Sequence, residues 1–213
     1  MKKIKTLVTT GLSETWGTDE SILLAGEWCK EGKRKKLLKG RDYETLPYHW
    51  NNVEKLKQDY SYLYNLNERV LKELTKSLNT YHGVNHPLRY WRIVIGPWTL
   101  SFLSTIWDRF EVLQKAFEEY DFDKTIAADI DELKITPRDF LNFGKSLLGH
   151  TWNHYIFSEI IKFKYSQKIN IETVPYKGIY RSEEVRQKNN SLREKILTSM
   201  DAFFGKIQKN YKV

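Results

Sequence analysis

The chain has 213 residues, of which 40% are hydrophobic, so it can bury one substantial core, and disorder of the whole chain is excluded. A single cysteine, Cys29, excludes a disulfide framework, and the apolar run behind the first lysines is too short for a secretory signal, which favours a cytoplasmic protein. The net charge is +8, because residues 1–41 hold ten Lys/Arg against five Asp/Glu, residues 162–213 hold twelve against five, and the middle holds thirteen against seventeen.

The first fifty residues predict two short strands with a helix between them. The β-branched run over residues 4–10 predicts a strand that ends at Gly11 and enters a loop of small and hydroxyl side chains. A helix is expected to begin at residues 18–21. Its inward-facing side chains are expected to be Ile22, Leu23 and Trp28. A second strand is predicted around residues 43–47, and this order of elements is typical of an α/β fold.

Two long helices are predicted in the middle of the chain. Apolar side chains recur at steps of three and four from Val53 to Leu78, behind two asparagines that can cap a helix, and the helix is expected to end near Gly83. A second helix is predicted to start at Pro87, which suits a first helical turn. We expect a break or kink in it at Gly96-Pro97.

The last third of the chain predicts further helices and one strand. Residues 136–139, Thr-Pro-Arg-Asp, have the spacing of a capping box and introduce a helix, and another helix follows Gly149. Residues 168–174 alternate as a strand does, and residues 182–207 predict a final long helix. The expected fold is therefore a helix-rich α/β domain, with a short parallel sheet packed by long helices.

Several kinds of site are disfavoured by the sequence. His150 and His154 have helical metal-ligand spacing, but Thr151 stands where a zincin motif needs a glutamate, so no metal site is predicted. Cys29 lacks a neighbouring base, which argues for burial rather than catalysis. No glycine-rich phosphate loop occurs, which argues against an ATPase or a dehydrogenase. The apolar run over residues 91–107 contains an arginine and a proline, so no transmembrane helix is predicted.

One group of candidate binding residues follows the predicted strands. Thr10, Glu14 and Trp16 lie in or at the loop after the first strand, Glu27 lies on the next element, and His49 follows the second strand. Open α/β sheets bind ligands at the loops that follow the carboxyl ends of their strands. These side chains are therefore expected to contact a substrate.

A second group lies in the tract His86 to Trp98. Arg89 and Arg92 could hold a phosphate or carboxylate, and Trp98 could stack on a sugar or a base. The competing interpretation is an aromatic core whose arginines pair with Asp108 or Glu111. The sequence leaves both interpretations open.

Three runs of sequence resemble a known family. They are LVTTGLSETWGTDESILLAGEWC, LPYHWNN and YHGVNHPLRYWRIVIGPWTLSFLSTIWDRFEVLQ, and they cover about residues 5 to 117. In this order they resemble the amino-terminal part of a family of transferases encoded with bacterial O-antigen and other surface-polysaccharide genes. The resemblance implies a two-domain, GT-B-like glycosyltransferase whose two Rossmann-like halves face a cleft.

The resemblance also implies a division of the chain. Residues 1–181 would form an amino-terminal, acceptor-side Rossmann-like domain, and residues 182–213 a basic connector helix toward a second half. Members of the family are longer than this chain, so that half is expected elsewhere, as the rest of a truncated protein or as a partner subunit. It would bind the nucleotide-sugar donor. No cofactor is expected in this chain itself.

Glu14 is the first candidate for a catalytic base and His49 the second. The expected substrate-binding residues are Thr10, Trp16, Glu27, Arg89, Arg92 and Trp98. The substrates would be a nucleotide sugar and a glycan or lipid-linked acceptor. The alternative is a non-catalytic binding or assembly module that docks on a partner or on a membrane surface through its basic ends. Nucleic acid is not an expected partner, because no recognition motif occurs.

Overall fold

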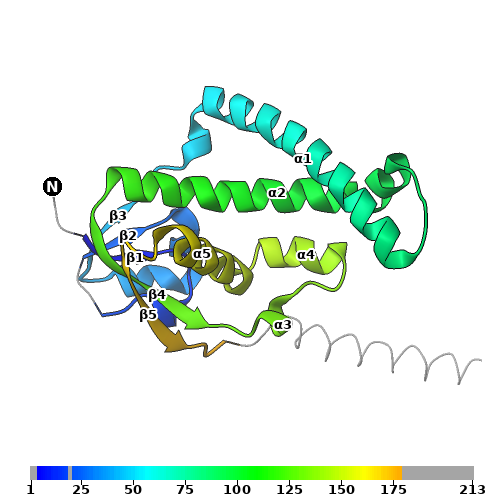
Figure 1. Ribbon diagram of the computed structural model, residues 1–213. Coiled ribbons are helices and arrows are strands. Elements are labelled where there is room, and N and C mark those ends of the chain that lie inside the picture. Colours follow the sequence, from blue (N-terminus) through cyan, green and yellow to red (C-terminus); the bar gives the residue numbers. More distant parts are fainter. Residues whose placement is uncertain (1–3, 19–20, 179–213) are drawn as a thin grey trace, which may run out of the picture.

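A five-stranded parallel sheet organises the protein. The computed structural model describes residues 4–18 and 21–178, so the predicted helix over residues 182–207 and the connector over residues 182–213 lie outside the described residues. The sheet has the order β3-β2-β1-β4-β5, and every neighbouring pair is parallel (Figure 1). The strands are β1 (Ile4–Val8), β2 (Ser21–Leu24), β3 (Asp42–Thr45), β4 (Phe122–Asp129) and β5 (Asn170–Pro175).

The strand order is Rossmann-like, and it defines a preferred place for a ligand. From β1 the chain moves outward through β2 to β3, and then crosses back to β4 on the other side of β1. Loops after neighbouring strands therefore diverge between β1 and β4, at the carboxyl ends of the strands. The predicted α/β class and parallel sheet are confirmed.

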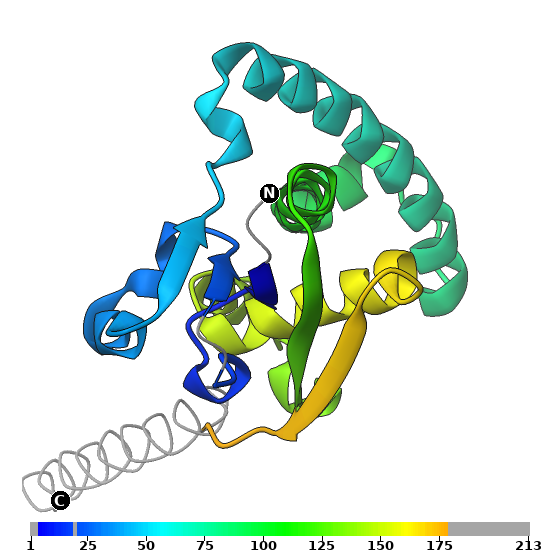
Figure 2. The same ribbon diagram turned by 90° about the vertical axis from the view of Figure 1, so that its left-hand side faces the viewer.

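Two long antiparallel helices connect β3 to β4. The helix α1 (Val53–His82) is capped by Asn52, whose side chain accepts the N–H groups of Glu54 and Lys55, and it ends at Gly83 with φ of 64°. Both ends agree with the prediction. The helix α2 (Leu88–Glu119) packs between α1 and the sheet (Figures 1 and 2).

Pro97 does not interrupt α2, which contains it within one continuous helix, so of the break or kink that we expected at Gly96-Pro97 the break is wrong. A proline removes one N–H from the helix ladder and leaves the carbonyl four residues earlier without that donor. Here that carbonyl belongs to Ile93, whose residue is 70% exposed, so water can supply the missing hydrogen bond.

The helix predicted to begin at residues 18–21 is also wrong. Residues 21–24 form β2, and Glu27–Lys30 form a 3-10 turn. Ile22, Leu23 and Leu24 are all fully buried, as expected of a strand inside a parallel sheet.

The last helices and strand largely follow the prediction. A short helix, α3 (Glu132–Ile135), precedes α4 (Phe140–Leu147), which Asp139 caps by accepting the N–H of Asn142. The helix thus begins three residues later than the capping box predicted. The helix α5 (His150–Tyr165) follows Gly149, and β5 then completes the sheet, both close to their predicted places.

The core has two layers because side chains of a strand alternate between faces. On one face, apolar side chains of β1 and β2 pack under α2 and α5, around Leu7, Leu113 and Phe157. On the other face, Trp16 and Cys29 pack against apolar side chains of β1 and β2. Within residues 4–18 and 21–178, no helix combines the length and apolar character that a membrane crossing requires.

Candidate functional site

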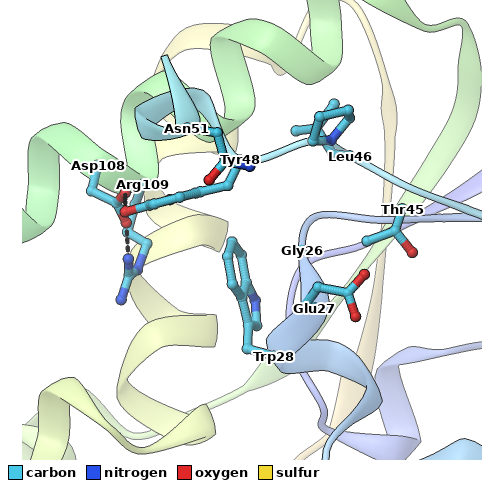
Figure 3. Close-up of a pocket in the computed structure, with 10 residues that line it drawn as sticks. Gly26, Glu27, Trp28, Thr45, Leu46, Tyr48, Asn51, Asp108 and Arg109 are labelled. Atoms are coloured by element: carbon cyan, nitrogen blue, oxygen red, sulfur yellow. Dashed lines mark hydrogen bonds and ion pairs between the residues drawn. The ribbon is translucent and has the colours of Figure 1, made fainter. Parts of the chain in front are cut away.

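A cavity of about 470 Å³ opens where β2 and β3 end. It lies beside the loops that follow these strands, with α2 forming the opposite wall (Figure 3). Its lining combines two aromatic rings with an amide, two carboxylates and a guanidinium. The lining residues are Gly26, Glu27, Trp28, Thr45, Leu46, Pro47, Tyr48, Asn51, Asp108 and Arg109.

Asp108 joins the wall from α2 to the loop after β3. Its carboxylate accepts hydrogen bonds from the Tyr48 hydroxyl at 2.7 Å and from His49 Nε2 at 2.9 Å, and it contacts the Arg109 guanidinium closely. The Arg109 Nε–H donates to Asn153 Oδ1 of α5 at 2.9 Å. Since these partners come from three separate elements, the wall is held rigidly in place.

Trp28 forms the aromatic centre of the cavity. Its Nε1–H donates to the backbone carbonyl of Thr9 at 2.9 Å, which ties the indole to the end of β1. The ring meets Tyr48 edge-on and stacks on Phe157, each at 6.4 Å between centroids, and the Arg109 guanidinium lies 6.0 Å from it. An indole fixed in this way offers a preorganised surface to a ligand.

Gly26 gives the indole the room it needs. A Cβ built on Gly26 would lie 2.2 Å from Cζ3 of Trp28, although the backbone there is extended and would accept any residue. We therefore expect Gly26→Ala to displace the indole and to raise the KM for a ligand of this cavity about tenfold, since overpacking costs about 1–3 kcal/mol. The matched control is Gly144→Ala in α4, where a Cβ meets nothing within 4 Å. An unchanged KM in Gly26→Ala would contradict the role of the ring.

A second, smaller cavity of about 170 Å³ adjoins the first and shares Trp28 and Arg109 with it. It lies where β1 ends and α5 begins. Its lining residues are Thr10, Trp28, Glu31, Arg109, Leu147, Leu148, His150, Asn153 and Phe157.

A buried polar cluster lies behind the larger cavity, between α1 and α2. The ammonium of Lys55 bridges the carboxylates of Asp59, at 3.1 Å, and Glu111, at 2.5 Å. Burial, followed by the charge of Lys55, lowers the pKa of His49 to about 4. Burial alone would raise the pKa of Asp59, but hydrogen bonds from Trp50 and Lys55 outweigh it and lower this pKa.

A ring nitrogen of His49 and carboxylate oxygens of Asp59 and Glu111 lie within 4.8 Å of one another, the spacing of a metal-binding group. The ammonium of Lys55 already supplies positive charge between the two carboxylates. The group therefore works as an ion-pair network that joins α1 to α2.

Of the site residues predicted to follow the strands, some line the cavities and others lie away from them. Thr10 lines the smaller cavity and Glu27 the larger one. His49 is buried beneath the larger cavity rather than in its lining, with Nδ1 lacking a partner among the described residues. Trp16 is buried in the second core layer, and Glu14 accepts a hydrogen bond from the N–H of Lys177.

The predicted residues of α2 lie elsewhere. Arg89 and Arg92 precede Asp108 by 19 and 16 residues, which corresponds to about 24–28 Å along a helix at 1.5 Å per residue. Arg92 pairs with Glu68 of α1, and Trp98 stacks on Phe102. The structure does not bring this tract to either cavity.

Sequence reasoning missed the residues that complete the site. Asp108 was considered only as a possible partner of the arginines, and neither Arg109 nor Asn153 was considered as a site residue. The available signal was the adjacent Asp-Arg pair inside an apolar helix. Charged residues are rarely buried unless they are paired, so such a pair indicates a buried polar site.

The strand order defines a Rossmann-like α/β domain, and its two cavities lie at the ends of the strands. The chain belongs to the LIC12162 family of transferases, whose model matches residues 5–212. Neither among the curated proteins nor among the solved structures does the chain find a significant match.

Proposed function

We propose that the chain is the acceptor-binding domain of a sugar transferase that acts in the biosynthesis of a bacterial surface polysaccharide of the O-antigen type. The larger cavity is the observation that carries this proposal. It lies at the strand ends, its volume is within the range of small-molecule sites, and its lining is aromatic and polar. Membership in a transferase family supports it.

The lining suits a sugar. The faces of Trp28 and Tyr48 can contact the C–H surface of a pyranose, as aromatic rings bury apolar area without needing a charge. Asn51, Glu27 and Arg109 surround the rings with hydrogen-bonding groups for hydroxyls. A pocket for a purely apolar ligand would not need this polar rim.

The transfer step requires a base for the acceptor hydroxyl. The hydroxyl oxygen forms a bond to the anomeric carbon of the donor as the bond from that carbon to the nucleotide phosphate breaks, and the carboxylate takes the proton. Glu14 is the candidate base that the sequence suggests. Glu27 lies in the loop after β2 and lines the larger cavity, and its exposed side chain is paired with Lys30. The geometry favours Glu27.

A two-domain arrangement completes the proposal. The resemblance to GT-B-like glycosyltransferases supports a second Rossmann-like half that binds the nucleotide sugar, either in the same protein or in a partner subunit. This chain then supplies the acceptor side, with a glycan or a lipid-linked glycan in the larger cavity.

The experiment is transfer from a panel of nucleotide sugars to glycan acceptors, followed by mass spectrometry, with the chain alone and together with a supplied donor-binding half. Absence of turnover in both formats would overturn the proposal.

Where turnover is found, we expect Glu27→Gln to lower kcat about 100-fold, the lower range for loss of a general base. Glu14→Gln is the matched variant and is expected to change kcat less than threefold. The reverse ranking would return the role of base to Glu14.

One observation favours the alternative of a docking module. Ile93, Leu141 and Leu148 are between 69% and 86% exposed, on α2 and at α4, so apolar surface is available to a partner or to a membrane face. Binding to liposomes or to a partner that persists without any glycan binding would favour this function over transfer.

A further inference from the structure

Arg109 has more hydrogen-bonding capacity than its protein partners use. A guanidinium carries five N–H donors. Within the part of the chain that the structure describes, hydrogen bonds account for two of them, Nε–H to Asn153 and one Nη1–H to Asp108. The side chain is only 19% exposed, and it lines both cavities. The remaining N–H groups of Arg109 are not among the buried atoms that lack a partner, so they face the two cavities and are available to an acceptor group of a ligand.

Asn153 fixes the direction of this guanidinium. Its Nδ2 donates to the carbonyls of Leu147, at 2.8 Å, and Gly149, at 2.7 Å. The amide is therefore oriented with Oδ1 toward Arg109, which holds the guanidinium at the boundary between the two cavities.

His150 offers a second donor to the smaller cavity. The N–H of Gly11 donates to His150 Nδ1 at 3.2 Å, so the proton of the neutral ring lies on Nε2. Burial, followed by the charge of Arg34, lowers the pKa of His150 and keeps the ring neutral at pH 7. With Nδ1 occupied, Nε2–H is the atom that can donate to a ligand.

The smaller cavity is lined by charged side chains of both signs. Arg109 contributes a full positive charge, and the carboxylate of Asp108 that it contacts also accepts hydrogen bonds from Tyr48 and His49. Glu31 also belongs to the lining and opposes an anion.

We propose that the smaller cavity binds an oxyanion, the phosphate or carboxylate substituent of the acceptor sugar, with Arg109 and His150 as its donors. This inference rests on the proposed function, since it places the sugar ring over Trp28 in the larger cavity and its anionic substituent across Arg109. The volume agrees, because about 170 Å³ corresponds to five or six groups at about 30 Å³ for each water molecule, and a phosphate group has five heavy atoms.

The test measures binding of inorganic phosphate, glucose 1-phosphate, glucuronate and glucose to the whole chain by calorimetry. We expect glucose 1-phosphate or glucuronate to bind at least tenfold more tightly than glucose. The tighter of the two identifies the anion as phosphate or carboxylate. Equal affinity for glucose and for both anionic sugars would overturn the proposal.

Variants distinguish a specific role of Arg109 and His150 from nonspecific attraction of an anion to positive charge. Arg109→Met and His150→Asn are each expected to weaken binding of the anionic sugar at least tenfold, since Asn keeps an acceptor for Gly11 N–H but lacks the Nε2 donor. Arg69→Met, which removes an exposed arginine of α1, is the matched control and is expected to leave affinity unchanged. Undiminished binding in His150→Asn and Arg109→Met would overturn the proposal.

Glu31→Gln is expected to have the opposite effect on the affinity for the anionic sugar. Removing the opposing carboxylate is expected to tighten binding of the anionic sugar about threefold, and weaker or unchanged binding would contradict an anion in this cavity. His150→Asn and Glu31→Gln keep the test decisive where Arg109→Met does not fold. Failure of sugar transfer with intact phosphate binding would overturn the function alone, whereas transfer to neutral acceptors without phosphate binding would overturn the anion site alone.

Discussion

Acidification from pH 7 to pH 4 is expected to lower the free energy of unfolding by about 3 kcal/mol through His154 alone. The imidazole is 1% exposed, and its Nε2 accepts the N–H of Ala128 at 3.0 Å. Its Nδ1–H is shared between the hydroxyls of Thr9, at 3.2 Å, and Thr10, at 3.3 Å. A proton added at Nε2 would break the bond to β4, so the folded protein resists protonation.

The direction of this pH effect on stability follows from the pKa values of His154 in the unfolded and the folded protein. Burial lowers the pKa of His154 from 6.5 to about 4, so the unfolded chain binds a proton at a pH where the folded chain does not. The contribution to stability is complete above pH 6.5 and is lost as the pH falls toward 4. The interval between a pKa of 6.5 and one of about 4, at about 1.4 kcal/mol for each tenfold change in protonation, less the partial protonation of the folded form at pH 4, corresponds to about 3 kcal/mol.

Urea unfolding at several values between pH 7 and pH 4 measures this dependence. The control is His154→Gln, which does not titrate and is expected to be less stable at pH 7 but to show a shallower pH dependence. Equal slopes in the two proteins would contradict the assignment to His154. His49 is the weaker candidate for such an effect, because the contact with Asp108 favours its protonated form and opposes the lowering by burial.

Trp28→Ala is expected to raise the KM for the acceptor about 100-fold. The substitution removes the surface on which the sugar rests, the edge-on contact with Tyr48 and the packing against Arg109 and Phe157. A contact between the indole and the sugar contributes about 0.5–1.5 kcal/mol beyond the buried area, and with the apolar area that the ring buries against the sugar the loss approaches a 100-fold effect.

Steady-state kinetics with the accepted glycan measures the effect, and the melting temperature shows whether the variant is folded. Trp28→Phe keeps a ring and is expected to lose less than tenfold. Tyr60→Ala, at an exposed aromatic residue of α1 outside both cavities, is the control. A folded Trp28→Ala protein with an unchanged KM would show that no sugar rests on this ring.

Local signals made part of the fold predictable. The asparagine cap of α1, its glycine stop and the start of α5 after Gly149 depend on neighbouring residues alone. The helix prediction for residues 21–24 was wrong because a four-residue apolar run has no period that distinguishes a strand from a helix. β4 was not predicted because its buried part, Thr125 to Ala128, lies between charged residues, and its partner β1 is more than one hundred residues earlier.

The site was predictable only where it follows the strands. The loops after β1 and β3 and the element that carries Glu27 were expected to bind a ligand, and Thr10 and Glu27 do line cavities. Arg109 and Asn153 lie inside long helices, and their approach to Trp28 depends on how α2 and α5 pack on the sheet. The adjacent Asp-Arg pair signals a buried charge, but nothing in the local sequence tells which loop Arg109 or Asn153 will approach.

The central position of β1 also determines how the chain must assemble. β1 pairs on one side with β2, which follows closely in sequence, and on the other side with β4, which comes only after the α1–α2 hairpin. During synthesis β1 therefore remains an open edge until residues 122–129 have left the ribosome. Folding of this sheet is expected to be slow, and protein interrupted within the hairpin is expected to aggregate through that edge.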